Sequence, residues 1–436
     1  MQFIPNIIFT IILGLGIYFF TKNVKRLFRN IRLGKSIDRS DRKSERWANM
    51  IRIALGQSKM VRRPLSGFLH VIVYIGFIVI NIEVLEIILD GILGTHRLFL
   101  PYIGDGAYGF LIGTFEILAL LVFVSITVFW CRRNVLKIKR FFGKEMTSWP
   151  KNDANNILYF ELVLMSLFLL MNATDVNLQQ SGIGNVISQF LFPFFQDTSL
   201  GAMHLIERSA WWLHIIGILA FLNYLYYSKH LHILLAFPNT FYANLKPQGQ
   251  FANNKTVTKE VQLMMDPNAD PYATSSEETE PEKFGASDVT DLNWVQLMNA
   301  YTCTECGRCT SVCPANLTGK ELSPRAIMMK TRDRLEEVGR NIDANKGAFK
   351  DDGKPLLGEG YVTQEEIWAC TSCNACVEEC PVNIDPLSII MEMRQYLVME
   401  ESAAPQELNA MMQNIENNGA PWQYNQMDRL NWVDEA

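Results

Sequence analysis

The chain has 436 residues, enough for two or three domains, and 49% of them are hydrophobic. Its net charge of -5 gives no indication of nucleic-acid binding, and most of its 9 cysteines lie in two short runs near the end, which excludes a disulfide framework spread along a secreted chain. The apolar residues gather in the first half of the chain and the polar residues in the second.

Five segments of the first half are long enough and apolar enough to cross a bilayer, which takes about 20 residues. The first has neither a basic start nor a small-residue cleavage site, so it is expected to stay as a helix and not to act as a signal peptide. The sequence therefore predicts a transmembrane domain over residues 1–240, with helices that begin near Phe3, Phe68, Ala107, Ile157 and Leu205.

Lysine and arginine are distributed unevenly between these segments. They are dense in residues 22–63 and in the loop "CRRNVLKIKRFFGK", and they are absent from residues 172–203. Because basic loops stay on the cytoplasmic side, the N-terminus is predicted to lie outside and everything after His232 inside. This places the cysteines in the cytoplasm, at the inner membrane, where thiolates persist and do not pair as disulfides.

Histidines occur near the ends of two predicted spans. His70 starts the second span, and His232 follows the fifth at the same cytoplasmic surface. On a continuous helix His214 and His232 share one face about 27 Å apart, whereas His230 points some 160° away. A haem b held by His70 and His232 fits this arrangement. His230 is the alternative to His232, and a purely packing role is the alternative to haem.

The second span also carries two acids, Glu83 and Glu86, in its outer half. Buried acids in a membrane helix are costly and tend to serve proton transfer, so they are candidates for quinone chemistry. The alternative is that they face a polar cavity or a neighbouring helix for packing.

The second half begins with a polar, acidic linker over residues 241–290, which includes "DPNADPYATSSEETEPEKFG". A soluble domain is expected over residues 291–400. Its segments "SPRAIMMKTRDRLEEV" and "PLSIIMEMRQYLVMEE" open with Ser or Pro, which is typical of helix starts. No strand pattern is evident, so an all-α fold is predicted for both halves.

Two cysteine runs, "CTECGRCTSVCP" and "CTSCNACVEECP", have the spacing C-x2-C-x2-C-x3-C-P of bacterial-type ferredoxins. Three cysteines at short gaps surround one cluster, and the fourth is carried away on the next helix to the other cluster. The expected ligand sets of the two [4Fe-4S] clusters are Cys303, Cys306, Cys309 and Cys380 for the first, and Cys313, Cys370, Cys373 and Cys376 for the second.

Zinc is the alternative occupant, because C-x2-C pairs also form zinc sites. Two sets of three plus one cysteine, each followed by proline, favour iron–sulfur clusters. The gap between Cys313 and Cys370 is longer than in small two-cluster ferredoxins, so helices are expected to fill it, with the clusters close enough to exchange electrons directly.

These segments resemble known families. The stretch "HIIGILAFLNYLYYSKHLHILLAFP" is similar to the last helix of the γ subunit of respiratory nitrate reductase, a five-helix dihaem cytochrome b. The stretch "WVQLMNAYTCTECGRCTSVCPANLTGKELSPR" resembles the C subunit of heterodisulfide reductase. The combination looks like the membrane-bound iron–sulfur oxidoreductases that include electron-transfer-flavoprotein:menaquinone oxidoreductases, and the resemblance covers nearly the whole chain.

The chain departs from these families at two points. The nitrate reductase subunit has a second histidine ten residues after the first in its second helix, where this chain has Ile80. His214, the candidate ligand of a second haem, therefore lacks its expected partner, and His96 and His204 are the remaining candidates. No CCG motif of the fused catalytic domain is present, and the tail over residues 401–436 resembles the linker that precedes that domain.

Together these features predict an electron-transfer subunit with no catalytic residues of its own, because the chemistry belongs to cofactors. Electrons would pass between a cytoplasmic partner, two clusters, haem b and a membrane quinone, which the resemblance implies to be menaquinone. A quinol-driven heterodisulfide or sulfur reductase and a membrane redox sensor are the alternatives. The resemblance implies a partner subunit of the heterodisulfide reductase B type, or an electron-transfer flavoprotein. Trp422, Tyr424, Trp432 and nearby Arg429 are expected to anchor the partner.

Overall fold

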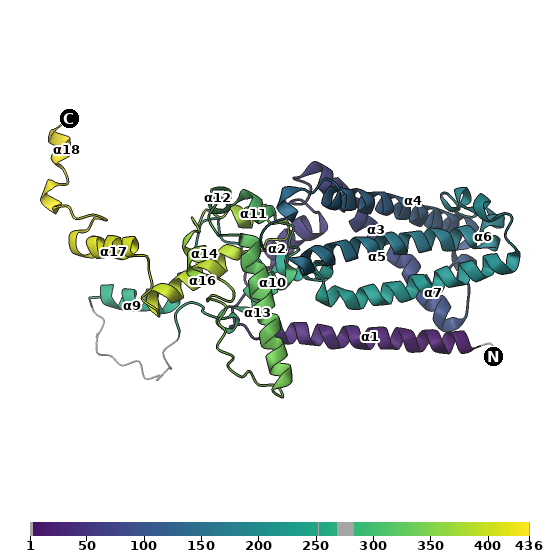
Figure 1. The fold of residues 1–436 in the computed structure, drawn as a ribbon, viewed down its shortest axis with the longest axis horizontal. Helices are drawn as coiled ribbons and strands as arrows, with labels where there is room; N and C mark the ends of the chain where they lie inside the picture. The colour runs from purple at the N-terminus through teal and green to yellow at the C-terminus, as the bar shows by residue number, and fades with distance from the viewer. Residues whose placement is uncertain (1–2, 252, 268–282, 436) are drawn as a thin grey trace.

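The computed structural model describes residues 3–251, 253–267 and 283–435. These residues form helices and loops, and their extended contacts are limited to two isolated bridges, Lys35–Asn293 and Leu357–Val362. Figure 1 shows a bundle of long helices, a group of shorter helices at one end of it, and a thin extension beyond. The prediction of an all-α fold is confirmed.

Five long helices make up the bundle and correspond to the five predicted spans, since each is long enough and apolar enough to cross a membrane. Proline in the first turn begins three of them, where its missing N–H removes no helical hydrogen bond. Short helices α2 (Lys43–Met50) and α6 (Val176–Ser181) lie in the connections. The long helices are α1 (Ile4–Ile31), α3 (Pro64–Leu93), α4 (Leu100–Asn134), α5 (Ser148–Thr174) and α7 (Leu200–Tyr224).

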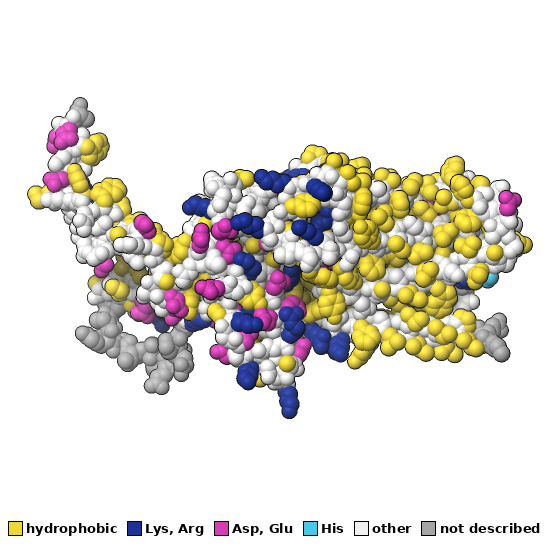
Figure 2. Space-filling model, viewed as in Figure 1, with side chains coloured by type: hydrophobic (Ala, Val, Ile, Leu, Met, Phe, Trp, Pro, Cys, Tyr) yellow, Lys and Arg dark blue, Asp and Glu magenta, His cyan; other side chains and the backbone are white. Residues whose placement is uncertain are grey.

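The surface of the bundle is apolar over most of its length. On α1, for example, Ile7, Ile11 and Tyr18 are all exposed. Figure 2 shows hydrophobic side chains over the bundle and Lys and Arg side chains gathered where it meets the shorter helices. An exposed apolar surface of this extent suits lipid tails and not water.

The fifth span is interrupted before His232. Helix α7 ends at Tyr224, two 3₁₀ turns follow, and Ser228 between them is extended (φ -112°, ψ 150°). The Ser228 hydroxyl accepts a hydrogen bond from the N–H of His230. A new helical turn begins there and leads into α8 (His232–Phe241). The prediction that His214 and His232 share one face of a continuous helix is therefore wrong, because this turn sets the direction of His232.

The shorter helices form a domain whose core is shared with the bundle. Ala286 and Val289 are completely buried in it, so its packing starts slightly before residue 291. Leu27 of α1 and Leu231 lie in the same core. The domain consists of α10 (Trp294–Thr302), α11 (Arg308–Val312), α12 (Pro314–Leu317), α13 (Pro324–Ala344), α14 (Gln364–Trp368), α15 (Ala375–Glu379) and α16 (Pro386–Met399).

Two segments lie outside this core. Helix α9 (Lys255–Met265) occupies part of the expected linker, and most of the acidic stretch that follows α9 lies outside the described residues. Helix α17 (Gln406–Asn418) and helix α18 (Asn431–Asp434) extend away from the domain in Figure 1. No residue of α17 or α18 is buried.

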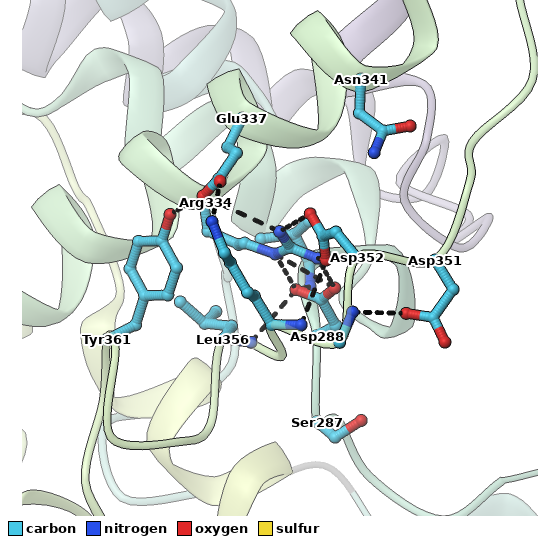
Figure 3. Close-up of polar contacts among 12 residues, drawn as sticks. Ser287, Asp288, Arg334, Glu337, Asn341, Asp351, Asp352, Leu356 and Tyr361 are labelled. Carbon is cyan, nitrogen blue, oxygen red and sulfur yellow. Dashed lines mark hydrogen bonds and ion pairs between the residues drawn. The ribbon is translucent and has the colours of Figure 1, made fainter. Parts of the chain in front are cut away.

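A buried arginine organises the long segment between the two cysteine runs (Figure 3). Arg334 on α13 is only 1% exposed and donates to Asp288 at 2.7 and 3.0 Å and to Asp352 at 2.7 and 2.9 Å. Glu337, one turn further along α13, accepts from Lys354 at 2.8 Å and from the hydroxyl of Tyr361. The start of the domain and the loop before α14 are thus both tied to α13.

Replacing Arg334 by methionine is expected to destabilise this domain by about 3 kcal/mol or more, because two carboxylates would be left without their cation. The midpoint of urea unfolding, followed by tryptophan fluorescence in the full chain, measures the change. Lys354→Met is the matched control, since Lys354 is exposed and should change the free energy of unfolding by less than about 1 kcal/mol. Equal midpoints for the two variants would contradict this role of Arg334.

Candidate iron–sulfur and haem-binding residues

Each cysteine run forms a loop between two helices, with the same backbone pattern in both. The first loop joins α10 to α11 and the second joins α14 to α15. In each loop the second and fourth residues after the first cysteine have a positive φ. Alternation of this kind points successive backbone N–H groups toward one centre, which suits an anionic cluster. The residues are Glu305 (54°) and Gly307 (70°), and Ser372 (55°) and Asn374 (61°).

The loops surround two cavities, and the cysteines line them in the predicted sets. Cys303, Cys306, Cys309 and Cys380 line the first cavity, and Cys313, Cys370, Cys373 and Cys376 line the second. Cys376 also reaches the first cavity, so the two share a wall. Each fourth cysteine is thus placed at the other run's cavity. That the cysteines bind iron in these sets stays a prediction.

The residues present fit clusters better than single metal ions. No group of three or more His, Cys, Asp or Glu side chains in the described part of the chain could hold one ion together. A cubane does not need such a group, because each of its cysteines binds a separate iron. Backbone N–H groups already approach two of the sulfurs: Ser372 N lies 3.4 Å from Cys370 Sγ, and Ile384 N lies 3.3 Å from Cys380 Sγ.

The cysteines that line the two cavities differ in their exposure. Cys303 and Cys380 at the first are buried, and burial raises the pKa of their thiols to about 12 and about 11. Such thiols are protonated at neutral pH until iron replaces the proton, so cluster loading releases protons. Cys373 at the second cavity is exposed. Cys373 is therefore the cysteine of the two runs that water reaches most directly, whereas Cys306 and Cys309 at the first cavity are half-buried.

Arginines surround the backbone of both loops. Arg394 on α16 donates to Ile367 O at 2.9 Å and lies 5.1 Å over the Trp368 ring, next to the second run. Arg325 lines the first cavity, donates to Arg140 O at 2.7 Å, and pairs with Glu145 at 2.7 Å. Arg325 also donates to Glu305 O of the first run at 3.4 Å, and Arg140 and Glu145 lie between α4 and α5, so Arg325 joins the first run to the bundle.

His70 and His232 face each other at the end of the bundle next to the first cavity. Their ring centroids are 6.4 Å apart, with an angle of 39° between the rings. Two imidazoles bound to one iron at about 2 Å each would have centroids about 6 Å apart. His232 Nδ1 lies 3.0 Å from Lys229 O, which leaves Nε2 free, and His70 Nδ1 is buried without a hydrogen-bond partner. The pair fits axial ligation of a haem.

The remaining histidines have other contacts. His230 lies 3.4 Å from Glu161 and 5.3 Å from the Phe221 ring, and its ring centroid is 5.4 Å from that of His232. His214 is buried, with Nδ1 3.0 Å from Leu164 O and the ring of Phe168 beside it. The two candidate partners of His214 lie elsewhere: His96 pairs with Asp175 and His204 with Glu207. The structure brings together His70 and His232, and it does not bring a histidine to His214.

Buried charges that the sequence analysis missed connect the two sites. Lys229 pairs with Glu305, which lies inside the first cysteine run, and with Asp153 at 3.8 Å. Glu305 also pairs with Arg332 at 2.8 Å. Burial lowers the pKa of Lys229 while Glu305 and Asp153 oppose this change, and the two cations hold the pKa of Glu305 below its usual value despite burial. The sequence carries one sign of this contact, since Glu305 is a charged residue between two cysteines of the first run.

A second buried contact runs from the first cavity toward His70. Arg308, which lines that cavity, is 3% exposed and donates to Lys59 O at 3.2 Å and Met60 O at 3.3 Å. These carbonyls belong to the segment directly before α3, the helix that carries His70. Arg308 therefore links the first cavity to the segment that leads into α3, the helix of His70.

Comparison with known proteins identifies the second domain. Residues 302–384 match the family model described as a 4Fe-4S dicluster domain, so the chain contains such a domain. The chain is 28% identical over 99% of its length to the "probable iron-sulfur-binding oxidoreductase FadF" of Bacillus subtilis, and it covers 61% of that protein. It is 26% identical over 92% of its length to an "EtfAB:quinone oxidoreductase" of Syntrophomonas wolfei, and it covers 55% of that protein.

A third relative matches only part of the chain. This relative, one polypeptide of the dihydromethanophenazine:CoB–CoM heterodisulfide reductase of Methanosarcina mazei, is 26% identical over 35% of this chain and 37% of its own length. The chain thus spans about three-fifths or less of the relatives it matches along its length. No solved structure matches it. These likenesses support an iron–sulfur oxidoreductase that transfers electrons.

Replacing the fourth cysteine of each run tests whether it binds the cluster of the other run. Cys380→Ser is expected to damage the cluster held mainly by the first run, because Cys380 lines the first cavity, and to leave the second cluster in place. Cys313→Ser, the matched variant, should have the reverse effect. Electron paramagnetic resonance of the anaerobically purified, reduced protein distinguishes the two clusters. Loss of the second-run cluster in Cys380→Ser would show that the ligands are not exchanged.

Proposed function

We propose that this protein carries electrons between a redox partner at the iron–sulfur domain and a quinone in the membrane, through two [4Fe-4S] clusters and one haem b. The observation that carries the proposal is the order of the sites. The exposed Cys373 lies at the second cavity, Cys376 lies between the two cavities, and Arg308 connects the first cavity to the segment before His70. Clusters and haem bound there would supply one-electron transfer.

The chain's own residues set the positions of these sites. Lys229 orients His232 through its carbonyl and holds the first run through its ammonium group. Arg325 donates to Glu305 O and to Arg140 O, and so joins the same run to the loop between α4 and α5. Because the contacts are buried, the distance between the histidine pair and the first cavity is fixed by the fold and does not depend on a flexible linker. The basic loops at this end support a cytoplasmic position of the iron–sulfur domain, because basic loops stay on that side of the membrane.

A quinone oxidoreductase is favoured over a heterodisulfide reductase by the extent of the likeness. The relative named EtfAB:quinone oxidoreductase matches 92% of the chain, including the bundle, whereas the heterodisulfide reductase relative matches 35%. On this basis the electron donor is an electron-transfer flavoprotein and the acceptor is a quinone of the inner membrane, menaquinone by resemblance. Reduction of a heterodisulfide or sulfur substrate by quinol is the second candidate, with the opposite direction of flow.

Cofactor content tests this proposal. The protein purified anaerobically is expected to contain about eight irons in clusters and one haem b per chain. His70→Ala should abolish the haem absorbance, whereas His230→Ala should leave it intact because His230 contacts Glu161 instead. His204→Ala is a control from the other end of the bundle. Two zinc ions without clusters, or two haems in a pyridine haemochrome assay, would contradict the assignment.

The partner is proposed to dock on the tail and on the exposed side of the second cavity. Trp422, Tyr424 and Trp432 are exposed on a segment that extends from the domain, and Met427 is 86% exposed. Exposed aromatic side chains on such a segment suit anchoring in pockets of a partner. The proposed partner is a CCG-type subunit like heterodisulfide reductase B, which would place its own redox site near Cys373.

Deleting the residues after Asn418 is expected to release this partner in a pull-down while the spectra of the clusters and the haem are unchanged. The single change Trp422→Ala should weaken binding at least fivefold, the usual effect of an interface anchor. Asn417→Ala, a change at an exposed residue of α17, should not weaken binding. Binding at full strength by the truncated protein would place the docking surface around the cysteine runs instead.

A further inference from the structure

A row of acidic side chains runs along α3 toward the end of the bundle remote from the iron–sulfur domain. Glu83, Glu86 and Asp90 are spaced by three and four residues, so they share one face of the helix. They are 3%, 2% and 8% exposed. Three buried carboxyl groups within two turns of a membrane helix carry a large desolvation cost, so the structure must either neutralise them or use them.

The outer two acids belong to a continuous chain of contacts that reaches the surface. Glu86 accepts from the hydroxyl of Tyr108 at 2.9 Å, and Arg97 donates to that same hydroxyl at 3.2 Å. Arg97 donates to Asp175 at 2.9 Å, and Asp175 lies 3.4 Å from His96. The side chain of His96 is 45% exposed. These contacts link Glu86 to a titratable group at the aqueous surface, but the guanidinium of Arg97 keeps its protons, so they hold Glu86 in place and do not relay a proton.

Asp90 provides a second connection to the same surface. Its carboxylate accepts from the N–H of Arg97 at 2.8 Å and from the N–H of Leu98 at 3.1 Å, in the loop that joins α3 to α4. These bonds place Asp90 at that loop, as the outermost carboxyl group of the row. Glu116 on α4 has a structural role, because it accepts from Ile187 N at 2.7 Å and Ser188 N at 3.0 Å.

Glu83 has no such explanation. Its Oε2 atom is buried without a hydrogen-bond partner, although it lies at the inner end of the row. The charged and titratable groups that act on it come from every side: Arg97 from the loop, Glu116 from α4, and Glu86 and Asp90 from its own helix, with Tyr108 on α4 nearby. A carboxyl group kept in this position without a bond in the fold is suited to exchange a proton with a molecule that reaches it.

We propose that the row Glu83–Glu86–Asp90 carries protons between a quinone head group inside the bundle and the aqueous phase at the end remote from the iron–sulfur domain. This inference rests on the proposed function. When a quinol is oxidised, two O–H bonds break and two protons leave through Glu83, and the two electrons would pass one at a time to the haem that His70 and His232 would hold. Reduction of a quinone is the reverse. Glu83 lies about 20 Å along α3 from His70, so the head group would lie between them.

The test uses the full protein and the water-soluble quinol menadiol. Menadiol is mixed with the oxidised protein, and the absorbance of the reduced haem is followed by stopped flow. Glu83→Gln is expected to slow haem reduction by menadiol at least tenfold, while haem reduction by dithionite keeps its rate. Glu83→Asp, which retains a carboxyl group, should restore part of the rate and also guards against a folding defect. Glu207→Gln is the matched control, because Glu207 is buried on α7 and paired with Arg208 outside the row.

The side of proton release gives an independent readout. In proteoliposomes with menadiol and an oxidant at the iron–sulfur side, wild-type protein should release protons on the side of His96. An unchanged menadiol rate in Glu83→Gln, or protons released only on the iron–sulfur side, would overturn the inference and leave the proposed function standing. A wild-type protein whose haem is reduced by dithionite and never by menadiol would instead overturn the quinone function itself.

Discussion

One buried lysine occupies the place where the two halves of the protein meet. Lys229 follows the break at Ser228 and is almost enclosed, with Asp153 of α5 on one side and Glu305 of the first cysteine run on the other. Its carbonyl also fixes the ring of His232. A buried cation keeps its charge only where its counter-ions are in place. The position of the cysteine loop, the break in the fifth span and the direction of His232 therefore depend on one another.

The shared hydrophobic core has the same effect on a larger scale. Leu27 and Ile31 from the end of α1, together with Leu231 and Leu235, pack among the residues of the iron–sulfur domain. Gly34 lies so close to this domain that an added Cβ would come within 2.6 Å of Trp294 N. The domain is therefore built partly on the helices that enter the membrane. This continuity fixes the distance between the histidine pair and the cysteine loops, which a domain attached by a linker would not do.

Local patterns in the sequence predicted much of this structure, and long-range contacts were beyond them. The apolar segments indicated all five long helices, and the spacing of the cysteines indicated which of them would line each cavity, since both are properties of short segments.

The break at Ser228 could not be read in this way, because it depends on Asp153 and Glu305, which are distant in sequence. His232 was chosen as the partner of His70 from a continuous helix that does not exist, although their rings do face each other. Arg97 and Tyr108 were missed because neither residue forms a recognisable motif. The cluster ligands, the haem, the orientation and the partner stay predictions.

The two cysteine loops repeat one backbone pattern, but their surroundings make them unequal. At the fourth position the first loop has Gly307, where a Cβ would come within 2.8 Å of Arg140 O, whereas the second loop has Asn374 with a full side chain. The second run contacts the bundle half in a different way, because Glu378 and Glu379 of α15 pair with Arg62 and Arg63 in the segment before α3. The first loop thus meets the bundle half through a close backbone contact and the second run through ion pairs. Two like clusters would therefore lie in unlike surroundings, although the loops that would hold them have the same backbone pattern.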